Sequence, residues 1–152
     1  MATPEIYIRR ARQDDCERIL EWRNHPATRR YFFNPESIDL ITHRSWFAAI
    51  LEGTRNCHLL IAENATGCPI GVVRFDEEGD SARVNVYLDP GRHGHGLGKA
   101  MLDSALQWLE INSSVRTVNA DVLVENTASM HLFAAAGFKN TVCRFSLDLS
   151  RS

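Results

Sequence analysis

A glycine-dense turn at residues 91–98 separates two segments of different periodicity. Before the turn, apolar and polar residues alternate over residues 82–88, which predicts a half-buried strand. After it, apolar residues recur at helical spacing over residues 97–111. A strand, a glycine turn and a helix start form a general anion cradle, because glycines allow a tight turn and free helix amides point at the ligand. The turn therefore predicts an α/β fold with a phosphate-binding site.

The other segments complete a mixed α/β pattern, with an antiparallel meander leading into a β-α-β unit. We predict the order β-α-α-β-β-β-α-β-α-β. Beyond the two segments above, strands are expected at residues 6–11, 58–62, 70–75, 117–124 and 142–149, and helices at residues 14–24, 42–51 and 126–136.

Length and composition limit the class of protein. A chain of 152 residues, 44% hydrophobic, fits a single domain over residues 1–152. The net charge of −2 argues against nucleic-acid or anionic-membrane partners. The chain shows neither a membrane-length apolar run nor signal-peptide features, so a cytoplasmic protein is expected. Its four cysteines have no metal-ligand spacing, and we expect them to be reduced.

Three phosphate-binding motifs compete for the turn. A Walker A loop would need Gly at His93 and a hydroxyl residue at Ala100, which excludes that type of ATP site. The dinucleotide fingerprint would need Gly at Lys99. The pyrophosphate loop of acetyl-CoA-dependent N-acetyltransferases, Gln/Arg-x-x-Gly-x-Gly/Ala, fits as His93-x-x-Gly96-x-Gly98 except at its first position. The alternatives are a plain connecting turn and a metal pair at His93 and His95, which lacks a third ligand; no metal is expected.

A second motif makes the chain resemble the GCN5-related N-acetyltransferase (GNAT) superfamily. The motif begins at Asn126, continues with a small residue at Ser129 and an aliphatic-aromatic pair at Leu132 and Phe133, and ends in Gly-Phe at residues 137–138. Both motifs occur in order, and the resemblance covers essentially the whole chain. It implies the GNAT fold, a central mixed, mostly antiparallel sheet of six to seven strands flanked by about four helices.

The resemblance also implies acetyl-CoA as co-substrate, with direct acetyl transfer to an amine while both are bound. The strands at residues 82–88 and 117–124 would be parallel neighbours that splay apart around the pantetheine arm. The residues expected to contact acetyl-CoA are Leu88, His93, Gly94, His95, Gly96, Leu97, Gly98, Lys99, Asn126, Ser129 and Phe133.

The catalytic residues are less well defined by the motifs. The departing thiolate usually takes a proton from a tyrosine, but that position is Phe133 here. Water, an unassisted thiolate or Tyr87 would have to serve, or the protein would be inactive. Asp121 is a candidate base or water-positioning residue, with a surface ion pair as the alternative, and Asn85 could orient a water.

A narrower resemblance concerns the acceptor. Segments in the N-terminal half are similar to enzymes of pseudaminic acid biosynthesis, which acetylate the 4-amino group of UDP-linked amino-dideoxy sugars. It implies that Arg23 and His43 face the nucleotide, and that Trp46, Phe33 and Tyr31 stack on a base or the sugar. Core packing is the alternative for Trp46.

Two other functions stay open. One is acetylation of a protein N-terminus or a small amine such as an aminoglycoside. The other is a non-catalytic CoA-binding domain, for which Phe133 is the best support. A homodimer is also expected as an option, since the final strand could pair across two chains.

Overall fold

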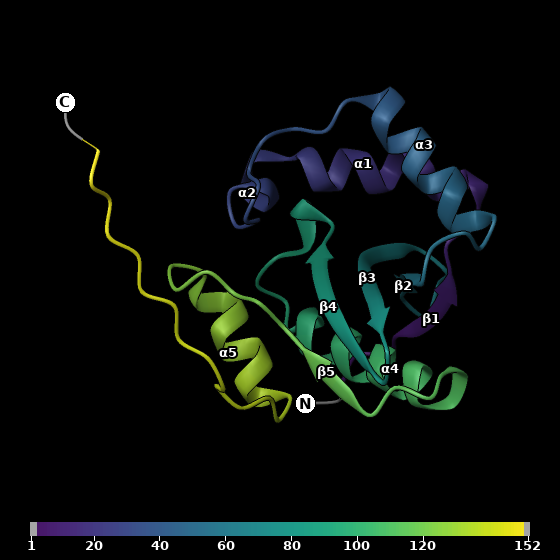
Figure 1. The fold of residues 1–152 in the computed structure, drawn as a ribbon. Coiled ribbons are helices and arrows are strands. Elements are labelled where there is room, and N and C mark those ends of the chain that lie inside the picture. Colours follow the sequence, from purple (N-terminus) through teal and green to yellow (C-terminus); the bar gives the residue numbers. More distant parts are fainter. Residues whose placement is uncertain (1–2, 151–152) are drawn as a thin grey trace.

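The computed structural model describes residues 3–150, which form a five-stranded sheet with helices on both faces (Figure 1). In chain order the elements are β1 (Tyr7–Arg10), the 3-10 turn η1 (Gln13–Asp15), α1 (Cys16–Asn24), α2 (Pro26–Arg29), α3 (Leu40–Leu51), β2 (Cys57–Glu63), β3 (Pro69–Glu78), β4 (Ser81–Leu88), η2 (Pro90–Arg92), α4 (Leu97–Asn112), β5 (Thr117–Asn119) and α5 (Thr127–Ala135). None of the helices within the described residues is both long and apolar enough to cross a membrane.

The sheet has the order β1-β2-β3-β4-β5. Neighbouring strands are antiparallel from β1 to β4, and only β4 and β5 are parallel. Helix α4 connects these two parallel strands. The predicted meander followed by a β-α-β unit is therefore confirmed.

Both faces of the sheet are covered, which explains the unbroken apolar run in β2. Leu60 and Ala62 point to one face and pack in a cluster with residues of α4, such as Met101. Leu59 and Ile61 point to the other face and pack with α1 and α3. Alternate residues of a strand face opposite sides, so a strand covered on both sides has no polar face.

Gly71 of β3 lies directly against α4, with no room for a side chain. A Cβ at this position would lie 2.5 Å from Met101 Sδ and 3.0 Å from the Tyr87 carbonyl oxygen. We expect Gly71→Ala to lower the free energy of unfolding by about 1–3 kcal/mol through overpacking, measured by urea denaturation. Gly98→Ala is the control, because its Cβ would meet Leu132 at an ordinary 3.7 Å. Equal stability of the two variants would contradict the prediction.

The structure corrects the prediction at the C-terminal end of the chain. The described residues contain five strands rather than six to seven, and five α-helices rather than about four. The expected strand at residues 142–149 is instead an extended, exposed segment that leaves the body of the protein beyond α5 (Figure 1). The strand expected at residues 117–124 ends at Asn119. In each case the physical reason is that no neighbouring strand is present to complete a hydrogen-bonded ladder.

Candidate active site

The glycine turn forms a bent loop that leads directly into α4. Gly94 and Gly96 have φ values of +84° and +69°, a conformation that residues with side chains rarely adopt. Gly96 is the N-terminal capping residue of α4, and open space surrounds the position of its missing Cβ. The amides of Leu97, Gly98 and Lys99 begin the helix, where backbone amides lack carbonyl partners within the helix. The loop therefore presents a helix N-terminus that can hold an anion.

The side chains of the loop are open to solvent. His93 and His95 are exposed, so neither imidazole is committed to the protein interior. Lys99 is exposed as well, and its Nζ forms an ion pair with Asp103 Oδ2 at 2.6 Å, one turn further along α4. An anion can therefore approach the N-terminus of α4 from solvent, alongside the exposed side chains of His93, His95 and Lys99.

Arg92 is a further cation of this turn, beyond the residues that the motif marks. Its Nη2 donates to Cys68 Sγ at 3.2 Å, and its Nε lies 3.5 Å from Asp89 Oδ2. A cation within the glycine turn, between Gly91 and His93, was the available sequence signal. Arg92 lines a hollow of about 440 Å³ together with Asp89, Gly91, His95 and Leu97. An anion in this hollow would meet a guanidinium as well as the helix amides.

Strand β5 pairs with the first residues of β4 and then ends, while β4 continues to Leu88. Ser81, Ala82 and Arg83 pair with residues 117–119, and within the described residues β4 has no partner on this side from residue 84 onward. The Asp89 amide donates to the Ile70 carbonyl of β3 at 2.8 Å. Because backbone groups alternate in direction along a strand, the amide of Leu88 points the opposite way, into the opening beside β5. The predicted parallel pairing is confirmed over three residues, but β5 ends where the pairing ends, so the opening beside β4 borders residues 120–124 rather than a second, splayed strand.

The second sequence motif forms the start and the inner face of α5. Asn126 caps the helix, since its Oδ1 accepts a hydrogen bond from the Ser129 amide at 3.2 Å. Phe133 is only 8% exposed, and its ring packs edge-on against Phe138 at 5.1 Å. The phenyl ring therefore belongs to the core cluster beneath α4 and α5. Asn126 and Ser129 remain at the start of the helix, closer to solvent.

One face of β4 carries the candidate catalytic residues. Asn85 and Tyr87 alternate with the core residues Val84 and Val86, so they face away from α4. Burial raises the pKa of the Tyr87 hydroxyl, and the nearby guanidinium of Arg74 only partly offsets this rise. Tyr87 therefore keeps its proton at neutral pH.

Asp121 lies just beyond β5 and reaches this same face of the sheet. Its Oδ2 forms an ion pair with Arg83 Nε at 3.0 Å, and both side chains are more than half exposed. This contact is the surface ion pair expected as the alternative to a base. The role of Asp121 as a base stays a prediction.

Arg23 of α1 is a buried cation at the edge of the opening. It is 9% exposed, and its Nη2 donates to the Asn34 carbonyl at 2.9 Å. Its guanidinium lies 3.9 Å from the centre of the Phe32 ring, which in turn packs edge-on against Tyr87 at 5.8 Å. Nη1 is buried without a hydrogen-bond partner, and no carboxylate among the described residues forms an ion pair with Arg23.

The charge of Arg23 is therefore poorly compensated. Burial lowers the pKa of Arg23. The nearby Tyr87 raises this pKa in part, and the cation of Arg74 lowers it further. Arg74 of β3 lies 5.7 Å from the Trp46 ring and forms an ion pair with Asp76 at 3.0 Å. A single arginine within the apolar run of β3 was the sequence signal for Arg74. Tyr87 thus lies near two guanidinium groups, those of Arg23 and Arg74, and against the Phe32 ring.

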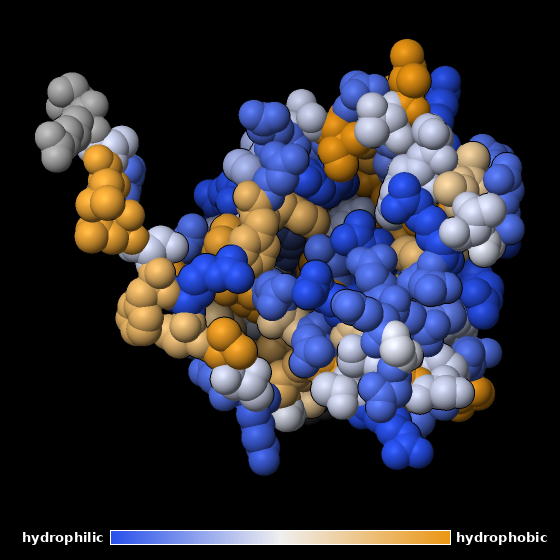
Figure 2. Space-filling model, in the orientation of Figure 1, coloured by the Kyte–Doolittle hydropathy of each residue, from blue (hydrophilic) through white to orange (hydrophobic). Residues whose placement is uncertain are grey.

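The remaining aromatic residues of the expected acceptor site have different degrees of exposure. Phe33 is 61% exposed, and Tyr31 is covered on one face by Arg30 at 4.5 Å. Trp46 packs against the cluster of α1 and α3, as its core alternative predicts, with its ring near Arg74. Figure 2 shows a hollow on this side of the molecule, between the region of α1 and α2 and the region of β4, β5 and α5.

His43 is enclosed between α1 and α3. It is 3% exposed, and its Nε2 donates to the Cys16 carbonyl at 2.7 Å. The narrower resemblance implies that this ring faces a nucleotide, but its Nε2 hydrogen is already donated to the Cys16 carbonyl inside the protein. The contact joins α1 to α3 and gives His43 a structural partner.

The enclosure of His43 predicts a pH dependence of stability. Burial lowers the pKa of His43 below 6.5, and its hydrogen bond to Cys16 only partly offsets the shift. The unfolded chain takes up a proton near pH 6.5 and the folded chain does not, so the free energy of unfolding should fall as pH decreases below 6.5. Urea denaturation between pH 7.5 and 5.5 should show a weaker fall for His43→Gln than for His93→Gln, an exposed control. Equal slopes would contradict this prediction.

Comparison with known proteins connects this geometry to a family. A family model described as an acetyltransferase (GNAT) domain matches residues 5–139, which is most of the chain. The match includes the glycine loop, both parallel strands and α5.

Two relatives give the extent of the sequence similarity. A Methanocaldococcus jannaschii protein is 27% identical over 143 residues, which is 90% of this chain but only 28% of that protein. The L-amino acid N-acyltransferase MnaT of Escherichia coli is 26% identical over 138 residues, covering 86% of this chain and 78% of that enzyme. The chain therefore spans less than a third of one relative and most of the other.

The fold is also found in solved structures. The spermidine N-acetyltransferase of Vibrio cholerae in complex with CoA and spermine superposes with a TM-score of 0.81. The two are 20% identical, and the superposition covers 90% of this chain and 82% of that one. At this identity the likeness establishes the shared fold.

Proposed function

The chain belongs to the acetyltransferase (GNAT) family, and from this membership we propose that it transfers the acetyl group of acetyl-CoA to a primary amine on a negatively charged acceptor. The leading acceptor is the 4-amino group of a UDP-linked amino-dideoxy sugar. The observation that supports a negatively charged acceptor is the buried guanidinium of Arg23, which has no anionic partner among the described residues. A buried cation of this kind is costly unless an anion pairs with it.

The residues along the opening fit acetyl-CoA, which supplies the acetyl group as a thioester. The free amides of residues 97–99 and the glycines before them suit its pyrophosphate, and Arg92 adds a cation at the same loop. The end of β5 leaves an edge of β4 along which the pantetheine arm can lie. The Leu88 amide would donate to the thioester carbonyl, a contact worth about 3 kcal/mol where negative charge develops.

Acetyl transfer requires removal of a proton from the acceptor amine and delivery of a proton to the departing thiolate, and side chains near this edge are candidates for both steps. An acceptor amine with a pKa near that of an α-amino group, about 8, is partly neutral at pH 7. A water held by Asn85 or Asp121 would then accept its remaining proton. Phe133 has no proton for the departing thiolate, but Tyr87 keeps its proton and is a candidate donor. A free thiol pKa near 8.5 also makes unassisted departure tolerable.

A second candidate acceptor is an L-amino acid. The E. coli relative is named as an L-amino acid N-acyltransferase, and an α-carboxylate would also satisfy the unpaired Nη1 of Arg23. The two arginines disfavour polyamines and aminoglycosides, because like charges repel across a poorly solvated site. Acetylation of a protein N-terminus would place a neutral peptide there, leaving Arg23 uncompensated.

The test follows thiol release from acetyl-CoA in the presence of separate acceptors. The panel contains a UDP-linked 4-amino-dideoxy sugar, several L-amino acids with their amides, spermidine, an aminoglycoside and an N-terminal peptide. Release with the nucleotide sugar or the free amino acids, and little with their neutral or cationic counterparts, is the expected result. Preference for spermidine, an aminoglycoside or the peptide would overturn the charge assignment. Acetyl-CoA binding without release on any acceptor would favour a non-catalytic CoA-binding domain.

A further inference from the structure

Asn24 joins the two ends of the loop that covers Arg23. It is the last residue of α1, and its side-chain amide contacts the backbone of Ile38, 14 residues further along the chain. Its Nδ2 donates to the Ile38 carbonyl at 2.8 Å, and its Oδ1 accepts from the Ile38 amide at 2.8 Å. Both distances are normal for protein hydrogen bonds. This Asn24–Ile38 pair therefore uses both polar groups of one side chain to fix the backbone of Ile38.

The loop between these ends, residues 25–38, contains α2 and leads to α3 (Figure 1). None of its residues belongs to the two apolar clusters that form the core of the described chain. Its Phe32 ring packs edge-on against Tyr87 of β4 at 5.8 Å. A loop with few apolar contacts to the core depends on hydrogen bonds for a fixed position. The Asn24–Ile38 pair supplies two such bonds at the base of the loop.

The position of the loop determines the surroundings of the Arg23 guanidinium. The Asn34 carbonyl accepts from Nη2 at 2.9 Å, and the Phe32 ring covers one face of the group at 3.9 Å. These contacts leave Nη1 buried without a hydrogen-bond partner. The same contacts keep Arg23 poorly solvated, and a charge in such a place attracts an anion more strongly than one in water.

We propose that Asn24 is a positioning residue for the acceptor. Its two hydrogen bonds to Ile38 keep the loop closed over Arg23, so that the guanidinium stays oriented and poorly solvated for the acceptor's anion. Asn24 acts through the loop and does not contact the acceptor itself. This inference rests on the proposed function, because it takes Arg23 as the cation that pairs with the acceptor.

Amide hydrogen exchange, followed residue by residue, tests the Asn24–Ile38 pair in the full chain. The Ile38 amide should be protected, because Asn24 Oδ1 accepts its hydrogen. Asn24→Ala should accelerate exchange of this amide at least about 10-fold. Ser37→Ala is the control, since Ser37 is exposed and directly precedes Ile38, and it should leave this exchange unchanged. Circular dichroism and urea denaturation establish that both variants are folded.

Steady-state kinetics then tests the positioning role, with whichever anionic acceptor gives the fastest thiol release. Asn24→Ala should raise the KM for this acceptor about 10-fold and leave kcat and the KM for acetyl-CoA within about 2-fold. In a chain that already carries Arg23→Gln, Asn24→Ala should change the acceptor KM less than about 2-fold. The reason is that the loop position affects the acceptor only through the charge of Arg23. Ser37→Ala should leave all three kinetic constants unchanged.

Three results would overturn the proposal. Rapid exchange of the Ile38 amide in the wild-type chain would mean that the Asn24–Ile38 pair does not form in solution. Equal losses from Asn24→Ala with and without the charge of Arg23 would mean that Asn24 acts independently of Arg23. A fall in kcat together with a raised KM for acetyl-CoA would indicate a general structural role. Failure of the proposed function is a separate result, the absence of thiol release by the wild-type chain, and it leaves the exchange measurement intact.

Discussion

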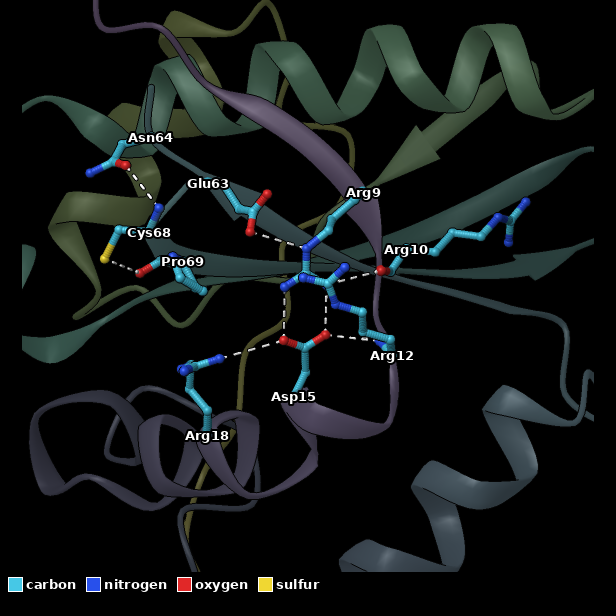
Figure 3. A network of polar contacts seen from close by, with 9 residues as sticks. All are labelled: Arg9, Arg10, Arg12, Asp15, Arg18, Glu63, Asn64, Cys68 and Pro69. Carbon is cyan, nitrogen blue, oxygen red and sulfur yellow. Dashed lines mark hydrogen bonds and ion pairs between the residues drawn. The ribbon is translucent and has the colours of Figure 1, made fainter. Parts of the chain in front are cut away.

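Asp15→Asn is expected to lower the free energy of unfolding by about 3 kcal/mol, because it removes the partner of a largely buried guanidinium. Asp15 is 1% exposed and accepts hydrogen bonds from Arg9 Nη1 at 2.7 Å and Nη2 at 2.9 Å (Figure 3). The Arg12 amide donates to the same carboxylate at 2.8 Å. Arg9 also pairs with Glu63 at 3.2 Å and is 20% exposed, which places the loss at the lower end for a broken buried pair.

The network joins the start of α1 to two strands, β1 and β2, that are already paired in the sheet. Arg9 lies on β1, Asp15 ends η1 just before α1, and Glu63 ends β2 (Figure 3). The carboxylate of Asp15 therefore ties the start of α1 to the sheet. Since α1 carries Arg23, loosening this tie would also disturb the acceptor side of the opening.

Asp14→Asn is the matched control, because Asp14 is adjacent in sequence but exposed. Urea denaturation at pH 7 should show a change within about 0.5 kcal/mol for this variant. A double variant, Arg9→Met with Asp15→Leu, should recover part of the loss, since it removes both charges of the buried pair and leaves only the Glu63 carboxylate, 19% exposed, without its 3.2 Å contact. Equal destabilisation by Asp14→Asn and Asp15→Asn would contradict the expected role of the buried carboxylate.

The same network has a pH signature. Burial alone would raise the pKa of Asp15, but the hydrogen bonds from Arg9 and the Arg12 amide outweigh it and hold the pKa below 3.8. The unfolded carboxyl takes up a proton near 3.8 and the folded one does so only at lower pH. The stabilisation is therefore complete above about pH 4 and is lost as pH falls below it. Asp15→Asn should lack this part of the acid dependence.

The sequence predicts well the elements whose signals are local. The alternation at residues 82–88 matches β4 (Ser81–Leu88), and the helix expected at residues 97–111 is α4 (Leu97–Asn112). The glycine turn has the left-handed conformations at Gly94 and Gly96 that a tight loop requires. Such features depend on neighbouring residues, so a local pattern contains the information they need.

The features that the sequence does not predict depend on contacts between residues far apart in the chain. The pattern at residues 142–149 is that of a strand, but a strand forms only beside another strand. The sequence marks Arg23 as a ligand contact, yet only the fold shows that its Nη1 is buried and unpaired. Arg74 gives no local signal of its place near the site, because the Trp46 ring beside it is 28 residues away in sequence. His43 gives no local sign that its ring will be enclosed.

Arg23→Gln is expected to reduce kcat/KM for an anionic acceptor by about 100- to 1,000-fold, equivalent to about 3–4 kcal/mol. Gln keeps a donor for the Asn34 carbonyl, which Arg23 Nη2 now contacts at 2.9 Å, but removes the charge. The KM for acetyl-CoA should stay unchanged, because the glycine loop lies at the start of α4 and Arg23 lies on α1. Circular dichroism would establish that the variant is folded.

The decisive comparison pairs this substitution with a change in the acceptor. When the carboxylate of an amino-acid acceptor is replaced by a carboxamide, or the nucleotide diphosphate is omitted, Arg23→Gln should alter kcat/KM less than about 5-fold. A purely structural role for Arg23, through its stacking on Phe32, would reduce activity equally on charged and neutral acceptors. Arg30→Gln, an equal charge change at an exposed position near the same loop, should leave both acceptors almost unaffected. Only a direct pairing of Arg23 with the acceptor's anion gives a loss that depends on both charges at once.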